Sequence, residues 1–390
     1  MEANEQLTLL RAAALGGDGD AANRLGMELG EAGRLSEAEG AFRVAAAAGV
    51  EGAFYNLGQV LSLQGRHEEA LGAYRSAAAD DDYGNSDLKA GDVLSDGLGR
   101  FEEAEQHYRR AIDAGNRDAL VNLAVLKEER GEREEAHELY ARAAAGGDEG
   151  ALRLLAELLA DDGQLAEAEE QLRPLADQGD AEALLDLGSI LREIDRDEEA
   201  ADAFRRAIQA GNEDAYSYLG LLLHHAGRVD EAEALYRQAL ADGVDDVLLN
   251  YGNLLSEDPA RLPEAESLYR RAIDSGDASL AHHNLALLLE ELERWDEVEA
   301  HALLAVAAGD SFGRLPLARA LARRGHGDDA ERHLREALDE GVVAAALDLA
   351  DLLAAAGRHE EARGFYEQAV ADDVEEAAER YERFRSERGA

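Results

Sequence analysis

Two pairs of adjacent histidines are the side chains of this 390-residue sequence that could bind a metal ion. The first pair is His224 and His225, and the second is His282 and His283. Successive residues of a helix point about 100° apart, so only one histidine of each pair can face a shared site. A protein-bound metal ion needs three or four converging ligands. The histidines therefore indicate groove-lining or solvent-exposed side chains, and a metal-dependent enzyme stays an alternative that stoichiometric metal would support.

The remaining sequence patterns do not indicate catalysis. A glycine-rich phosphate loop with its lysine and a His-Glu-x-x-His zinc motif are both absent from the sequence. The acidic segment Asp80–Asp87 has the composition of a calcium loop, but its spacing and the missing closing glutamate favour a solvated turn. There is no cysteine, which excludes disulfides and thiolate metal sites. We predict a non-enzymatic protein with no catalytic residue, no metal site and no cofactor.

The sequence is strongly acidic, with 85 Asp and Glu against 39 Lys and Arg and a formal net charge of −46. Duplex nucleic acid and anionic membrane surfaces would be repelled, because both require clustered basic residues. No segment approaches the length of about 18 apolar residues that a membrane span needs, and the N-terminal residues lack the pattern of a secretory signal. We therefore expect a cytoplasmic protein that binds neither nucleic acid nor membrane. The acid excess fits either a G+C-rich genome or a high-salt habitat, and the sequence does not separate the two.

A repeat of 32 to 34 residues organises the chain, and it must position any site. The anchor of the repeat is an alanine, replaced once by Val298, and the alanines are Ala38, Ala70, Ala104, Ala136, Ala168, Ala200, Ala232, Ala265, Ala330 and Ala362. A large side chain follows four residues later, an alanine seven later and a glycine eleven later in most repeats, as in Phe42, Ala45 and Gly49. This spacing predicts one face of a helix, and the glycine predicts a left-handed helix end.

A second set of positions predicts another helix before each anchor. A small residue lies twelve or thirteen residues ahead of every anchor, namely Gly26, Gly58, Gly91, Ala124, Ala156, Gly188, Gly220, Gly252, Ala286, Ala318 and Ala350. Each repeat is therefore expected to be a helical hairpin, closely packed at the small residue, that must stack on its neighbours. The third repeat carries two inserted residues and the eighth has Pro259 and Pro263 at its turn, so we expect these two to be irregular.

These positions resemble the tetratricopeptide repeat family. In the second repeat the matching residues are Leu57, Gly58, Ala70, Tyr74 and Ala77. Two departures are the 32-residue length of most repeats and the Ala-Gly junctions in place of a closing proline, and these junctions are similar to Sel1-like repeats. The resemblance implies an all-α fold, a right-handed α-solenoid superhelix of about eleven TPR-like hairpins with a concave inner surface.

The ends of the sequence are expected to close the stack. The first residues fit a lone second helix, and the last residues fit a first helix studded with charge. A solvated outer face is what the terminal repeat of a solenoid requires. We therefore expect an N-terminal capping helix over residues 1–16, eleven repeats over residues 17–373 and a C-terminal capping helix over residues 374–390.

The resemblance implies that the first helix of each hairpin lines the concave surface, where a partner would bind. Two residues before the small residue of that helix, the sequence places Asn56, Asn122, Asn250 and Asn284. A side-chain amide both donates and accepts hydrogen bonds, so such a row can hold an extended peptide by its backbone, as the asparagine ladder of some family members does. In the alternative, these asparagines satisfy neighbouring backbone groups or face water. The predicted partner-binding residues are Asn56, Asn122, Tyr218, His224, Asn250, Asn253, His283, Asn284, Arg319 and Arg323.

The seventh to ninth repeats carry the most polar and aromatic part of this surface, and we expect a partner to dock there. Acidic walls favour a neutral or basic segment, with an attraction that weakens as salt rises. Arg319 and Arg323 of the tenth repeat could hold an acidic residue at one end of the ligand. The leading hypothesis is a non-catalytic scaffold or adaptor that binds a peptide or helix of a partner protein. The alternative is a self-assembling or spacer solenoid, although the high charge favours a monomer.

Overall fold

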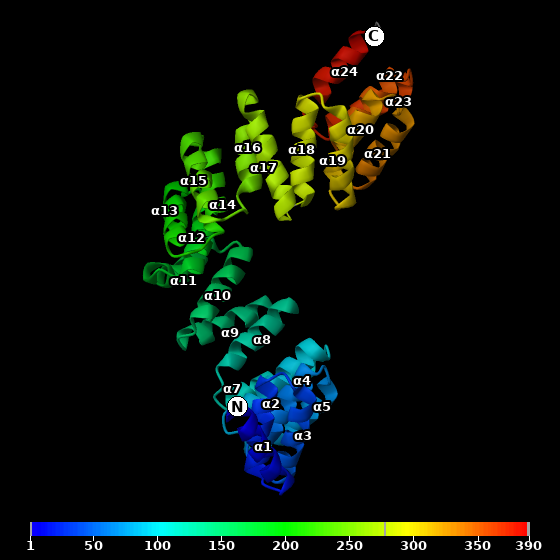
Figure 1. Cartoon of the computed structure of the whole chain (residues 1–390). Helices are drawn as coiled ribbons and strands as arrows, with labels where there is room; N and C mark the ends of the chain where they lie inside the picture. The colour runs from blue at the N-terminus through cyan, green and yellow to red at the C-terminus, as the bar shows by residue number, and fades with distance from the viewer. Residues whose placement is uncertain (1, 277, 388–390) are drawn as a thin grey trace. The chain divides into compact units, whose positions relative to one another are not determined.

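The computed structural model of the chain describes residues 2–276 and 278–387, and within them it is helical throughout. It contains 24 α-helices and no strand in the described part of the chain. The helices form two compact units, residues 1–194 and 195–390, each a stack of antiparallel helix hairpins (Figure 1). The predicted all-α solenoid of helix hairpins is confirmed. Met1 and residues 388–390, at the outer ends of the two expected capping helices, lie outside the described residues.

The first unit contains five hairpins flanked by a single helix on each side. Helix α1 packs against the first hairpin, and α12 packs against the last one. Its elements are α1 (Glu2–Leu15), α2 (Gly19–Glu31), α3 (Leu35–Ala47), α4 (Ala53–Leu63), α5 (His67–Ala77), η1 (Ala78–Asp80), α6 (Asn85–Asp92), η2 (Val93–Gly97), α7 (Phe101–Asp113), α8 (Asp118–Glu129), α9 (Arg133–Ala145), α10 (Glu149–Asp161), α11 (Leu165–Gln178) and α12 (Ala181–Glu193).

The second unit has the same plan, with α13 before its five hairpins and α24 after them. Helix α24 packs against α23 and carries Phe384, which is buried, with its ring centroid 4.9 Å from that of Tyr366. The elements are α13 (Asp197–Gln209), α14 (Ala215–His225), α15 (Val229–Asp242), α16 (Leu248–Ser256), η3 (Pro259–Arg261), α17 (Leu262–Ser275), α18 (Ala278–Glu291), α19 (Trp295–Ala307), η4 (Ser311–Gly313), α20 (Arg314–Arg323), α21 (Gly327–Asp339), α22 (Ala345–Ala355), α23 (His359–Ala371) and α24 (Ala377–Ser386).

Most second helices end at the glycine that the repeat predicts. At all nine of these glycines φ is positive, from 75° at Gly49 to 111° at Gly276, a conformation that a β-carbon disfavours. Asp373 also adopts it, with φ 53°. Asp81 does not: its φ is −107°, and the chain leaves α5 through the short helix η1 instead. The predicted left-handed helix end is thus confirmed wherever glycine occupies the position.

The two irregular repeats are confirmed at the predicted places. In the third repeat, α6 continues into a π-helical turn, η2, which accommodates an extra residue without breaking the helix. In the eighth repeat the turn is a 3-10 helix, η3, that begins at Pro259, and the Asp258 carboxylate caps it by accepting from the Ala260 backbone N–H at 2.9 Å.

Most hairpins are held together by a small residue of the first helix that lies under a large residue of the second. A β-carbon added to Gly58 would lie 2.7 Å from Cε1 of Tyr74, and one added to Gly26 would lie 2.6 Å from Cε1 of Phe42. Both rings are buried. We call this contact the glycine–ring interlock, and it sets how closely the two helices of a hairpin approach each other.

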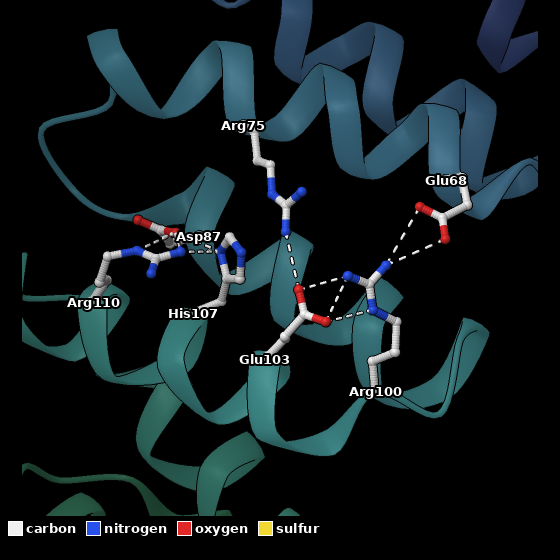
Figure 2. Close-up of polar contacts among 7 residues, drawn as sticks. All are labelled: Glu68, Arg75, Asp87, Arg100, Glu103, His107 and Arg110. Carbon is white, nitrogen blue, oxygen red and sulfur yellow. Dashed lines mark hydrogen bonds and ion pairs between the residues drawn. The ribbon is translucent and has the colours of Figure 1, made fainter.

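The second helices carry a repeated ion-pair arrangement on their outer surface. Arg100, just before α7, donates from Nε to Glu103 at 2.6 Å and from Nη1 to Glu68 of the preceding second helix at 3.2 Å (Figure 2). Arg75 also reaches Glu103, at 3.4 Å (Figure 2). The same bridging occurs from Arg66 to Glu69 and Glu39, from Arg261 to Glu264 and Glu233, from Arg294 to Glu297 and Glu266, and from Arg358 to Glu361 and Glu331.

The interlock predicts opposite effects for two glycine-to-alanine changes in one hairpin. Gly58→Ala should lower the free energy of unfolding by about 1–2 kcal/mol, because the methyl group overpacks against Tyr74. Gly72→Ala should raise it by about 0.5–1 kcal/mol, because Gly72 lies in α5 with open space around it and alanine is the better helix former. Urea unfolding of the two variants measures both values. Equal effects of the two changes would contradict the interlock.

Candidate functional site

Within each unit the first helices of neighbouring hairpins approach one another more closely than the second helices do. Contacts join α2 to α4 and α6 to α8 in the first unit, and α14, α16, α18, α20 and α22 in succession in the second. We call the surface formed by these helices the first-helix face. All ten predicted partner-binding residues lie on first helices.

In the first unit the predicted asparagines already bond to the neighbouring first helix. Asn56 Nδ2 donates to Asn23 Oδ1 at 3.2 Å. Asn122 Nδ2 donates to Asp92 Oδ1 at 2.7 Å, and the same oxygen accepts from the Tyr108 hydroxyl at 3.1 Å. Both asparagines are half-buried. Their amides therefore brace adjacent repeats and retain only part of their hydrogen-bonding capacity for a ligand.

The second unit contains one braced pair and one open asparagine. Asn284 Nδ2 donates to Asn253 Oδ1 at 2.8 Å, and the Tyr269 hydroxyl donates to the same oxygen at 2.9 Å. Asn250 is half-buried, and its side-chain amide has no hydrogen-bond partner among the described residues. Of the four asparagines in the predicted row, Asn250 is the best placed to bind a peptide backbone.

Tyr218 and His224 lie on the first helix α14, and His283 lies on the first helix α18. The Tyr218 side chain is exposed, with its ring centroid 5.7 Å from that of Phe204. His224 Nε2 lies 2.9 Å from Glu257 Oε1. His283 Nδ1 lies 2.8 Å from Asp310 Oδ2, without the alignment of a hydrogen bond. Each of these histidines thus faces one carboxylate.

The two histidines of the second pair point in different directions, as expected for adjacent helical residues. His282 is buried, and its Nδ1 lies 2.9 Å from Nδ1 of His301 in α19. In the described part of the chain, no group of three or more His, Asp or Glu side chains is arranged to hold a metal ion.

In the acidic segment, the side chains of Asp81 and Asp87 make internal contacts, while that of Asp80 lies outside the described part of the structure. The Asp81 carboxylate accepts from the backbone N–H groups of Tyr83 and Ser86. Asp87 turns away to a cluster with His107 and Arg110, where its Oδ1 lies 2.7 Å from His107 Nδ1 and 2.9 Å from Arg110 Nη2 (Figure 2). Burial of His107 lowers its pKa. These carboxylates do not converge on a common point, which agrees with a structural turn.

Arg319 and Arg323 lie beside a cavity of about 610 Å³ on the first-helix face of the second unit. Arg319 donates from Nε to Asp348 at 2.7 Å and from Nη1 to Glu290 at 3.3 Å. Arg323 is exposed and lies over Trp295, with Cζ 5.0 Å from the ring centroid. Arg319 is therefore engaged by two carboxylates of its own chain, which reduces its capacity to bind an acidic residue of a partner.

Burial destabilises the charged form of the two carboxylates that pair with Arg319. Burial raises the pKa of Asp348 and of Glu290, and the ion pairs with Arg319 oppose this rise without cancelling it. The cavity wall includes Trp295, which the sequence analysis did not assign to the site. Trp295 lies at the start of a second helix, where no binding residue was expected. It is the only tryptophan in the sequence, and this rarity could have marked it as a candidate.

Comparison with known proteins places the repeats in a family. The sequence model described as Tetratricopeptide repeat matches residues 23–85, 153–215 and 315–373, and a second model of that description matches residues 214–243. Together these matches cover more than half of the chain. No curated protein matches the sequence. A solved structure described as the crystal structure of MamA is similar, with 21% identity over 39% of this chain and 92% of its own and a TM-score of 0.35. None of the described helices has the length and apolar character required to cross a membrane.

The His282–His301 pair predicts a loss of stability in mildly acidic solution. Burial lowers the pKa of both histidines, and His301 also faces Arg270, Glu297 and Glu266. The unfolded chain, with histidine pKa values near 6.5, then binds protons that the folded chain does not. The pair makes its full contribution to the free energy of unfolding above about pH 6.5. This contribution declines as the pH falls below that value toward the folded-state pKa.

Thermal melting between pH 5 and pH 7.5 measures this effect. His301→Gln should flatten the pH dependence relative to the native protein, because one buried titrating group is removed while a hydrogen-bonding side chain remains beside His282. His137→Gln, at an exposed position, is the matched control. If the melting temperature of the His301 variant depends on pH as steeply as that of the native protein, the pair does not contribute to the pH dependence of stability.

Proposed function

Because the chain belongs to the tetratricopeptide repeat family, we propose that it is a non-catalytic adaptor that holds a segment of a partner protein on its first-helix face. The observation that carries this proposal is the second unit, where an open Asn250 amide, an exposed Tyr218 and the cavity beside Arg319 occupy one helix layer. An exposed aromatic and an open amide offer apolar contact and backbone hydrogen bonds together.

The charge of the chain supports a neutral or basic partner segment. Carboxylates such as Asp348 and Glu290 border the cavity, and the net charge of −46 opposes nucleic acid and anionic membranes. The proposed setting is the cytoplasm, with the protein as a monomer before it binds.

A spacer or self-assembling solenoid is the second candidate function. The observation that favours it is the outer surface of α1, where Leu9 is 68% and Leu15 is 90% exposed. Exposed apolar side chains of this kind are available to a second copy of the chain.

The adaptor proposal predicts that asparagine replacements on the first-helix face weaken capture of the partner from native cells. Asn250→Ala should weaken binding about fivefold, since a lost hydrogen bond costs about 1 kcal/mol. Additional replacement of Asn253 and Asn284 by alanine should weaken it further. Gln106→Ala, at an exposed second-helix position, is the control. Quantitative pull-down of the same partner by the triple variant at native strength would rule out this surface.

The two candidate functions also differ in the mass of the free protein. We expect a monomer of 42.0 kDa in light scattering from low to high salt, because charge repulsion opposes association at low salt. A stable oligomer without ligand, dissociated by Leu9→Asp with Leu15→Asp, would favour the spacer instead. Replacement of the exposed Leu63 by Asp serves as the control for surface hydrophobicity.

A further inference from the structure

Three repeats carry a histidine three residues after the anchor of the second helix, and these histidines are His107, His301 and His333. In each of them, Nδ1 lies beside the residue four places before the small residue of the first helix. The distances are 2.7 Å from His107 to Asp87 Oδ1, 2.9 Å from His301 to His282 Nδ1 and 3.3 Å from His333 to Arg314 Nη1. Of these three repeats, only the ninth therefore sets two imidazoles against each other.

Protonation has a different consequence in the ninth repeat. A protonated His107 gains an ion pair with Asp87. In the described part of the chain, neither His282 nor His301 pairs with a carboxylate. When both of these imidazoles are neutral, Nδ1–H of one can donate to Nδ1 of the other. When both are protonated, two N–H groups face each other, and the contact becomes a repulsion between like charges.

The charged groups that face the pair do not compensate for this repulsion. Glu266 and Arg270 of α17 and Glu297 of α19 act on His301. Each of the two carboxylates already forms ion pairs with two arginines. Burial lowers the pKa of His282 and of His301. At His301 the neighbouring imidazole and Arg270 add to the lowering of the pKa, while the two carboxylates oppose it without cancelling it.

The other elements packed against α18 and α19 are α16, α20 and η4. Helix α16 and η4 contain no charged residue, and Asp310, just before η4, faces His283. The charged residues of α20 are its three arginines, Arg314, Arg319 and Arg323. The remaining charged side chains of α17, α18 and α19 pair elsewhere or are exposed: Glu264 with Arg261, Arg271 with Asp245, Glu290 with Arg319, Asp296 and Glu299 with Arg324, and the exposed Asp274 and Glu291. None of these described carboxylates pairs with either imidazole.

The ninth hairpin also lacks two features that join the helices of other hairpins. Ala302 stands in place of the ring of the glycine–ring interlock. The turn between α18 and α19 holds Glu293 at φ 55°, a conformation that a β-carbon disfavours, whereas the next hairpin has Gly325 at the same position. The contact of His282 with His301 is the only polar side-chain contact that joins the described residues of α18 to those of α19. The attachment of these two helices by polar groups thus depends on two titratable side chains.

We propose that the ninth repeat is an acid-sensitive joint, at which protonation of His282 and His301 separates α18 from α19 while the neighbouring hairpins stay folded. Below about pH 6.5 the open hairpin binds protons that the closed hairpin excludes, so acid shifts the balance toward the open form. Local opening of this kind costs less free energy than unfolding of the whole chain.

The opening has a consequence for the first-helix face. Asn284 of α18 donates to Asn253 of α16, so displacement of α18 would break this brace between adjacent repeats. Under the adaptor function proposed above, on which this consequence rests, acid would weaken capture of the partner. The opening itself does not depend on that function.

The opening is measured on the full chain without a partner. Hydrogen exchange of the backbone amides is followed at pH 7.5 and pH 5.5, resolved by peptide and corrected for the intrinsic exchange rate. We expect protection in α18 and α19 to fall at least about tenfold, because each proton taken up on opening shifts the equilibrium about tenfold per pH unit below about 6.5. Protection in α14 and α15 should stay nearly unchanged. Trp295, the only tryptophan, begins α19, so its fluorescence emission should shift to longer wavelength over the same pH range.

Three variants assign the opening to the pair. His301→Gln keeps a hydrogen-bonding group beside His282 but does not titrate, so it should remove most of the fall in protection. His282→Asp reproduces the arrangement of Asp87 and His107, so that protonation of His301 gains an ion pair, and protection in α18 and α19 should no longer fall in acid. His333→Gln changes the same repeat position in α21 and is the matched control, which should leave the fall intact.

An equal fall in protection in the native chain and in the His301→Gln variant would overturn the joint. Opening of the His282→Asp variant in acid to the same extent as the native chain would overturn it too, as would a native chain that does not change between pH 7.5 and pH 5.5. Simultaneous loss of protection in every helix of the second unit would show global unfolding in place of a local joint. The adaptor function is tested separately: if α18 opens in acid and capture of the partner is unaffected, the joint stands and the partner does not bind at α18.

Discussion

The contact between a small residue of the first helix and a large residue of the second helix, which most hairpins make, is the constraint on which this structure depends. It fixes the separation of the two helices in a hairpin, because a single added β-carbon at Gly58 would come within 2.7 Å of Tyr74. Stacking requires hairpins of equal thickness, so a continuous first-helix face exists only where this separation is maintained. The ninth repeat is an exception: Ala302 stands in place of the ring, and Leu317 of the next first helix packs against both Ala302 and Ala286.

The same constraint explains which features the sequence revealed. The small residue, the ring and the helix-ending glycine occur within one repeat, so their spacing showed the hairpins, and the insertion before and after Gly91 showed the irregular joint at η2. The hydrogen-bond partners of the polar residues could not be predicted in this way, because these partners lie one repeat away in the sequence. Asn284 bonds to Asn253, and Arg319 bonds to Asp348, across 31 and 29 residues. Such pairs could be sought by comparing each inward position with the residue about one repeat later, but the sequence does not distinguish a braced asparagine from the open Asn250.

Charge is distributed unequally between the two surfaces of the stack. On the second helices, arginines at the turns bridge successive repeats, and their hydrogen bonds hold the pKa values of Glu39, Glu233 and Glu331 below the ordinary range. On the first helices, Asp186 and Asp348 have raised pKa values although each has an arginine partner. The outer carboxylates are thus stabilised in their charged form by the fold, whereas burial destabilises the charged form of these inner ones. A chain with 85 acidic residues can therefore remain stacked, because arginines neutralise much of the charge between successive second helices.

The large residue of the interlock can vary without a change of architecture. Leucine in place of the ring leaves the helix-to-helix contact at the small residue in place. Leu172 and Leu334 remain buried against Ala156 and Ala318, so the hairpins keep their thickness and their neighbours stack as before. The small-to-large contact lies within one hairpin, whereas charged pairs such as Arg319 and Asp348 join two successive first helices. The packing of a hairpin and the charge of the first-helix face are consequently set by different residues, and either can vary without disturbing the other.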